Sequence, residues 1–127
     1  MAPRRSPSSW PSLPDPDAWL EAYETIHLWS QIVGKVKMSE TPLINHWWNV
    51  ALFVGPEGLT TGSIPTDGGA FEIRLDVHRE ELVLLTSEGR TDGFDLNDQS
   101  VRSFYEQLTS LLEAHRIETR IWPMPVE

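Results

Sequence analysis

Residues 71–78 carry the pattern that most constrains the fold, because apolar and polar side chains alternate there at every position. The apolar members are Phe71, Ile73, Leu75 and Val77, and the polar members are Glu72, Arg74, Asp76 and His78. A period of two places the two sets on opposite faces of an extended strand. One face then packs on a core while the other meets water, as is typical of an antiparallel sheet.

Shorter apolar runs, separated by turn residues, lie on both sides of this strand. We predict strands at Trp48–Val54 and Leu59–Ile64, joined by Gly55-Pro56-Glu57-Gly58, and at Glu81–Thr86 and Thr91–Leu96, joined by Ser87-Glu88-Gly89-Arg90. Glycine in each connection can adopt the positive φ that tight hairpins need. A last strand is predicted at Ile117–Trp122, and Pro123 and Pro125 end it.

Two segments show helical spacing instead. The first begins at Asp15 and Pro16, a helix cap followed by a first-turn proline, and extends to about Met38. Its apolar stripe is Trp19, Ala22, Ile26, Trp29, Val33 and Val36. The second follows Asp98 as its expected cap and has its stripe at Val101, Phe104, Tyr105, Leu108, Leu111, Leu112 and His115.

The element order is helix, strand meander, helix, strand. It predicts an α+β domain with an antiparallel sheet of about five or six strands and two helices packed on one face. Residues 15–127 are expected to form this single domain. Residues 1–14 are rich in proline and serine and are expected to be a disordered leader.

Charge and composition exclude several partners. The formal net charge of −9 repels polyanions, so neither nucleic acid nor an anionic membrane is expected as a partner. Cysteine is absent, which removes disulfides and thiolate chemistry. Arg4-Arg5 is followed by no apolar stretch, so we reject a twin-arginine signal, and no run approaches the length of a membrane span. We therefore expect a cytoplasmic protein.

The most suggestive cluster is Asn45-His46-Trp47-Trp48, at the predicted junction between the first helix and the first strand. If Trp48 faces the helices, then Trp47 faces the other way and needs cover from a loop, a ligand or a second chain. The favoured interpretation is structural, with Trp47 packed under the leader or the loop at Pro65–Gly69.

His46 and His27 could instead form a two-imidazole site completed by Glu24 or Gln31, but no motif fixes that geometry. We therefore predict neither a metal nor a cofactor. The candidate ligand-binding residues are Tyr23, His27, Trp29, Asn45, His46 and Trp47. Asp76 and His78 are interpreted as part of a solvated strand face, and Gly34-Lys35 lacks the glycine-rich run of a phosphate loop.

Several motifs resemble an uncharacterised bacterial family of unknown function, DUF5996. They are Tyr23-Glu24-Thr25-Ile26-His27-Leu28-Trp29, Gly34-Lys35, Asn45-His46-Trp47-Trp48, Gly58-Leu59-Thr60-Thr61, Phe71-Glu72-Ile73, Ser87-Glu88-Gly89-Arg90 and Val101-Arg102-Ser103-Phe104-Tyr105. The resemblance implies no activity, substrate or cofactor. It implies that this chain corresponds to the N-terminal half of longer relatives, and hence that its uncovered surface could form a twofold homodimer.

The sequence thus favours a noncatalytic module that binds a small molecule or a partner. The alternative is an enzyme that uses His46 as an acid or base, or His46 with His27 as metal ligands, in a pocket walled by aromatic side chains. Replacing His46 by Ala separates the two, because an enzyme would lose activity while remaining folded.

Overall fold

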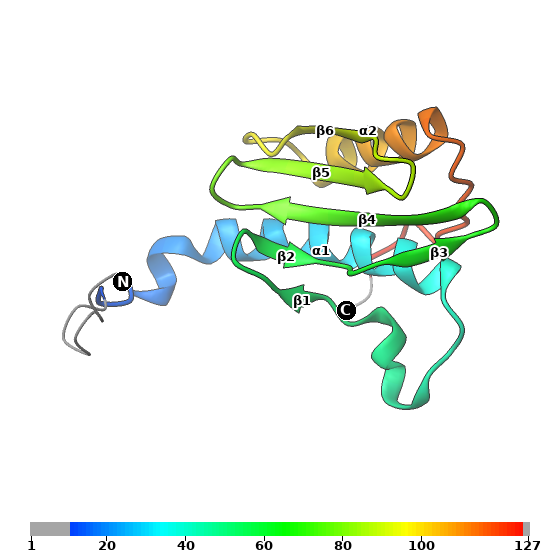
Figure 1. Cartoon of the computed structure of the whole chain (residues 1–127). Coiled ribbons are helices and arrows are strands. Elements are labelled where there is room, and N and C mark those ends of the chain that lie inside the picture. The colour runs from blue at the N-terminus through cyan, green and yellow to red at the C-terminus, as the bar shows by residue number, and fades with distance from the viewer. Residues whose placement is uncertain (1–10, 126–127) are drawn as a thin grey trace, which may run out of the picture.

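A computed structural model of the chain describes residues 11–125, which form a helical layer and a sheet (Figure 1). The helices are η2 (Pro16–Trp19), α1 (Leu20–Glu40), η3 (Asn45–Val50) and α2 (Val101–Ala114), where η denotes a 3-10 helix. The strands are β1 (Phe53–Val54), β2 (Gly58–Thr60), β3 (Ile64–Thr66), β4 (Gly69–Asp76), β5 (Glu81–Thr86) and β6 (Thr91–Asp95). The α+β class and the antiparallel sheet are confirmed.

The sheet has the order β1-β2-β4-β5-β6, and all of its pairings are antiparallel. β3 also pairs with β4, so the segment predicted as one strand at 59–64 is two short strands on one edge of β4. The buried side chain of Thr61 bridges the gap between them. The backbone N–H of Thr61 donates to the Ile73 carbonyl at 3.0 Å, and the Thr61 hydroxyl accepts the Ile73 N–H at 3.1 Å.

The core lies between the helices and one face of the sheet. The predicted alternation is confirmed for Phe71, Ile73 and Leu75, which are buried, but Val77 lies past the end of β4 and is exposed. The Trp29 indole of α1 stacks on Phe104 of α2, with ring centroids 5.1 Å apart and planes 9° apart. Its Nε1 atom is buried and has no hydrogen-bond partner among the described residues.

Three predicted features are wrong in detail. The predicted cap Asp15 is confirmed and accepts the Asp17 N–H at 3.1 Å, but it begins the separate 3-10 helix η2 rather than α1, and α2 is capped by Ser100 rather than Asp98. Residues 117–122 form no strand and run as an extended segment after α2. Backbone before Pro123 is restricted away from helix, and the segment contacts α1 through Lys35 instead of pairing with a strand.

The largest departure concerns Trp48–Val54, predicted as a strand. Residues 45–50 form η3 instead, and only Phe53 and Val54 join the sheet. His46 and Trp47 both have φ of 58°, a left-handed conformation that breaks any strand. The buried Asn49 holds the turn, because its Oδ1 accepts the Ile44 N–H at 3.2 Å. Hydrogen bonds from a side chain to nearby backbone groups compete in this way with the backbone hydrogen bonds between β-strands.

Most of the predicted leader, residues 1–10, lies outside the described residues. Pro11–Pro14 are exposed and belong to no helix or strand. No helix within residues 11–125 is long and apolar enough to cross a membrane.

Candidate functional site

The Asn45-His46-Trp47-Trp48 cluster lies on the η3 turn, where all four side chains are exposed. Trp47 and Trp48 retain 58% and 71% exposure, so the predicted cover over Trp47 is absent among the described residues. The interpretation that Trp48 faces the helices is wrong for the same reason. The His46 ring lies 6.5 Å from that of Trp48, and Asn45 Oδ1 accepts the His46 N–H at 3.1 Å.

The other candidate residues lie on α1. Tyr23 and His27 are exposed, with ring centroids 6.2 Å apart, and His27 Nε2 lies 3.3 Å from Gln31 Nε2. Trp29 belongs to the core and is only 7% exposed. The structure therefore distributes the six predicted residues over the η3 turn, one exposed face of α1 and the core.

The two histidines are far apart along the fold. The η3 turn meets α1 near Lys37, whose Nζ donates to the Ala51 carbonyl at 2.7 Å. His27 lies ten residues earlier on the same helix, which corresponds to about 15 Å along the axis. In the described part of the chain, no three His, Asp or Glu side chains gather as metal ligands.

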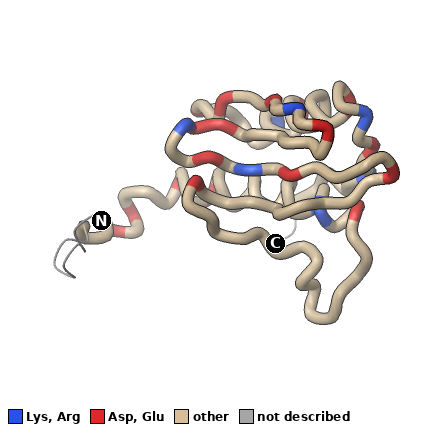
Figure 2. Tube along the Cα trace, in the orientation of Figure 1, with Lys and Arg blue, Asp and Glu red and all other residues tan. Residues whose placement is uncertain are grey.

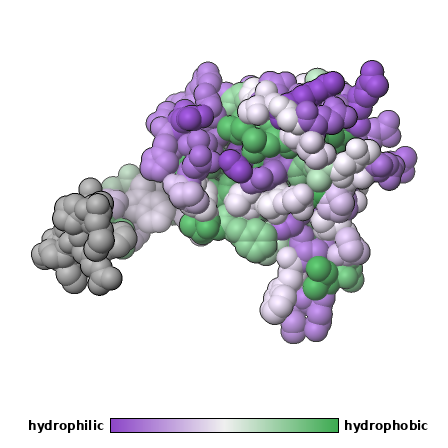
Figure 3. Space-filling model, in the orientation of Figure 1, coloured by the Kyte–Doolittle hydropathy of each residue, from purple (hydrophilic) through white to green (hydrophobic). Residues whose placement is uncertain are grey.

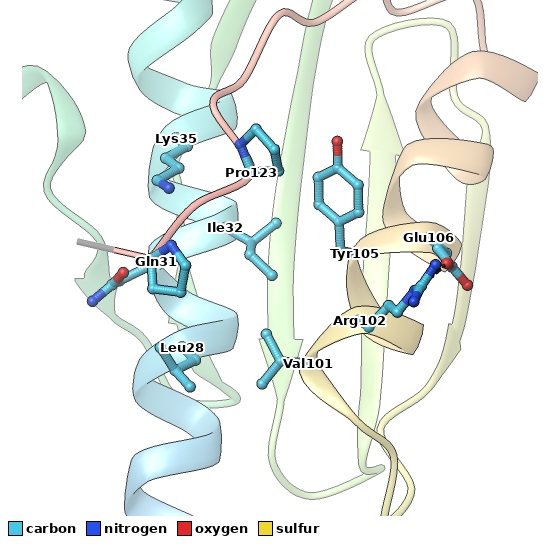
Figure 4. A pocket seen from close by; sticks show the side chains of 10 residues that line it. Leu28, Gln31, Ile32, Lys35, Val101, Arg102, Tyr105, Glu106 and Pro123 are labelled. Carbon is cyan, nitrogen blue, oxygen red and sulfur yellow. Dashed lines mark hydrogen bonds and ion pairs between the residues drawn. The ribbon is translucent and has the colours of Figure 1, made fainter. Parts of the chain in front are cut away.

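A groove that the sequence did not indicate lies between α1 and α2 (Figure 4). It encloses about 390 Å³. Its lining residues are Leu28, Gln31, Ile32 and Lys35 from α1, Val101, Arg102, Tyr105 and Glu106 from α2, and Pro123 and Pro125 from the C-terminal segment. Leu28 and Ile32 are four residues apart on α1, so they form one apolar wall, and Val101 and Tyr105 repeat that spacing on α2.

The C-terminal segment is held against α1 by a single ammonium group. Lys35 Nζ donates to the carbonyl of Trp122 at 2.7 Å and also to that of Met124. Both of these residues precede a proline, which restricts them away from helical backbone. The backbone bends at Met124, and both carbonyls lie within reach of the one lysine. Gly34-Lys35 therefore has a structural role in building the groove.

The side chains that line the groove carry a net positive charge, whereas the chain as a whole is negatively charged. Lys35 and Arg102 contribute two cations and Glu106 one carboxylate, in a chain of net charge −9. Arg102 Nε lies 3.0 Å from Glu106 Oε1, and the arginine side chain is 85% exposed. An exposed ion pair of this kind is weak, so its guanidinium can change partner at little cost.

Glu72 and Arg74 of β4 lie on a partly exposed strand face, in agreement with the predicted solvated face, and form ion pairs there. Arg74 binds Glu72 at 2.7 Å and Glu57 at 3.2 Å. Asp76 differs from the prediction because it is buried. Its carboxylate accepts the N–H groups of Arg79 and His78 at 3.0 and 2.9 Å, and these bonds lower the pKa of Asp76.

Comparison with known proteins adds one match. The model of a family of unknown function, DUF5996, matches residues 10–127. No curated protein and no solved structure matches the chain.

Proposed function

Since the chain belongs to DUF5996, a family of unknown function, we propose from its groove that it is a noncatalytic binding module for a small apolar molecule with one negative charge. The observation that carries this proposal is the composition of the groove. An apolar floor is bordered by Lys35 and Arg102, in a chain that is otherwise strongly acidic.

The size of the groove suits a small ligand. Its volume of about 390 Å³ falls at the lower end of the range for ligand pockets. Leu28, Ile32, Val101 and the ring of Tyr105 offer an apolar contact surface, while Arg102 can form a charge-assisted hydrogen bond to an acidic group. A net charge of −9 repels multiply charged anions, which favours a ligand with a large apolar body and a single charge.

The side chains of the groove favour binding over catalysis. Its lining offers no His, Ser, Thr or Asp, and Lys35 is already bound to two backbone carbonyls. A general acid or base must come within hydrogen-bond reach of the reacting atom, and His46 lies on η3, outside the lining. Catalysis by His46 stays a prediction, as do the cytoplasmic location and the single domain at 15–127.

Titration with two fluorescent probes tests the proposal. Anilinonaphthalene sulfonate carries one negative charge, and phenylnaphthylamine is its neutral counterpart. Arg102→Gln should weaken binding of the sulfonate about tenfold and leave the neutral probe unchanged, since only the former uses the guanidinium. Leu28→Trp should weaken both by filling the groove.

Arg120→Gln is the matched control, because Arg120 is exposed and does not line the groove. Unchanged affinity for both probes in Arg102→Gln and Leu28→Trp would place any binding elsewhere and overturn the proposal.

A further inference from the structure

β1 is an edge strand whose outer side is unpaired among residues 11–125. In an antiparallel ladder, alternate residues direct both their N–H and C=O groups to the same neighbour. Gly55 and Gly58 bond to each other across the β1–β2 connection, at 2.8 and 3.3 Å. Val54, one residue before Gly55, therefore turns its N–H and C=O to the free edge. Its side chain is 86% exposed.

The chain around this edge is uncharged. The sixteen residues from Thr41 to Pro56 include no Asp, Glu, Lys or Arg, and this is the longest such interval in the sequence. Figure 2 shows it as a continuous tan stretch, without red or blue, from the end of α1 through β1. Natural edge strands are commonly protected by charges, and β1 has none.

Exposed apolar side chains flank the edge. Figure 3 shows hydrophobic surface over β1 and on the segment that protrudes below it. Trp47 and Trp48 lie on that segment, while Trp19, Tyr23 and Ile26 lie on the first turns of α1 and the helix before it, which extend beyond the other end of the sheet (Figure 1). Residues 19, 23 and 26 recur at the spacing of anchors on one helix face.

The exposed area supplies a large part of what a stable interface needs. Phe53, Trp47, Trp48 and Tyr23 are each more than half exposed, and an aromatic side chain buries about 150–250 Å² when covered. With Val54, Trp19 and Ile26, the surface reaches several hundred Å². A standard interface needs about 800 Å² from each partner.

We propose that this surface, named here the β1 face and comprising Trp19, Tyr23, Ile26, Trp47, Trp48, Phe53 and Val54, joins two copies of the chain about a twofold axis at Val54. The Val54 residues of the two copies exchange N–H···O=C bonds and extend the sheet across the axis. Because the extension of α1 and the η3 segment lie beyond opposite ends of β1, the rotation carries each toward the other in the partner.

Charge selects a second copy as the occupant. Two molecules of net charge −9 repel one another, and repulsion is smallest where they meet through a surface without charges. The uncharged interval 41–56 supplies Trp47, Trp48, Phe53 and Val54, the central part of the β1 face. A self-complementary patch closes as a dimer, because each copy supplies the same groups.

Sedimentation velocity on the full chain at about 100 µM tests the proposal. The wild type should sediment as a dimer. Val54→Pro removes only the outward N–H, so it should leave the circular dichroism spectrum unchanged and weaken dimerisation at least tenfold. Val54→Lys places two like charges near the axis and should weaken it as well, less so at high salt.

The matched control is Thr91→Pro on the opposite edge, in β6, which should sediment as a dimer. Trp48→Ser tests the flank and should weaken association without altering the fold. A monomeric wild type at this concentration overturns the proposal, as does a dimer that persists in both Val54 variants, because the copies would then meet elsewhere. Probe binding in the α1–α2 groove is independent of either result.

Discussion

The two edges of the sheet differ in how they are protected. β6 carries Asp92, Gly93 and Asp95, and Asp92 is bound at 2.9 Å to His115, the C-cap of α2. β1 consists of Phe53 and Val54 and presents no charge. Charges on an edge strand discourage a second strand from pairing, whereas an apolar edge invites it. The contrast shows that one sheet can be closed to partners on one side and open on the other.

The open edge is positioned from inside the fold by Lys37. This side chain is 6% exposed, its Nζ donates to the Ala51 carbonyl, and it lies 4.6 Å from the centre of the Phe53 ring. Burial lowers the pKa of Lys37. The Lys37 ammonium group thus lies on the inner side of β1, and the outer side of the strand carries no charged side chain.

The largest loss of stability is expected from Gly58→Ala. Gly58 lies in β2, the only strand that pairs with β1 among the described residues. Gly58 has φ of 145°, and an added Cβ would lie 2.1 Å from the Leu75 carbonyl oxygen. We expect a loss of about 2–4 kcal/mol in the free energy of unfolding, measured by urea denaturation. Gly68→Ala is the control, because no atom lies within 4 Å of its added Cβ. Equal stability of the two variants would contradict the strain assigned to Gly58.

A smaller effect is expected from Lys37→Met, which keeps the apolar stem and removes the ammonium group. The bond to the Ala51 carbonyl is lost, so the free energy of unfolding should fall by about 1–2 kcal/mol in the same assay. Hydrogen exchange at β1 should accelerate more than at β6, because only β1 loses an anchor. Equal acceleration at both edges would show that Lys37 stabilises the fold globally.

The smallest effect concerns the closed edge and its dependence on pH. The bond from His115, then that from the Gly93 N–H, lowers the pKa of Asp92. A carboxyl with a lowered folded-state pKa contributes stability above its unfolded pKa of about 3.9, and the contribution is lost as pH falls through the folded value. Asp92 is 49% exposed, so solvent screening limits this to less than about 1 kcal/mol.

Asp92→Asn should therefore lower the melting temperature slightly at pH 7 and match the wild type near pH 2. Thermal unfolding followed by circular dichroism at both pH values measures this difference. A gap that persists unchanged at the lower pH would argue against the ionised Asp92 carboxylate as its cause.

The sequence predicted the regular part of the fold well because periodic burial dominates there. β4, β5 and α2 lie close to where they were predicted, and the expected apolar side chains Phe71, Ile73, Leu75, Phe104, Leu108, Leu111 and Leu112 are buried. It failed at residues 45–50, where the bonds of Asn49 and two left-handed residues decide the backbone. Neither the bonds of Asn49 nor the left-handed residues produce a periodic pattern of apolar residues in the sequence. Because residues 45–50 are not a strand, the predicted placement of Trp47 and Trp48 on opposite strand faces is wrong.

The groove was invisible to sequence reasoning for a different reason. Leu28, Ile32, Val101 and Tyr105 look like ordinary members of helical stripes, and only the crossing of α1 with α2 makes them two walls of one space. The third wall comes from Pro123 and Pro125, more than eighty residues from α1. Local patterns carry no information about such a distant contact. Two groove residues were considered from the sequence for other roles, Gln31 as a metal ligand beside His27 and Lys35 as part of a phosphate loop.

The bond from Lys35 to the Trp122 carbonyl spans 87 residues of sequence, most of the length of the chain. Closing so long a loop is entropically costly and tends to come late in folding, after local helices and hairpins have formed. A nascent or truncated chain can hold α1 and the meander and still lack the third wall. Binding in the groove would then report that residues 122–125 have reached their place against α1.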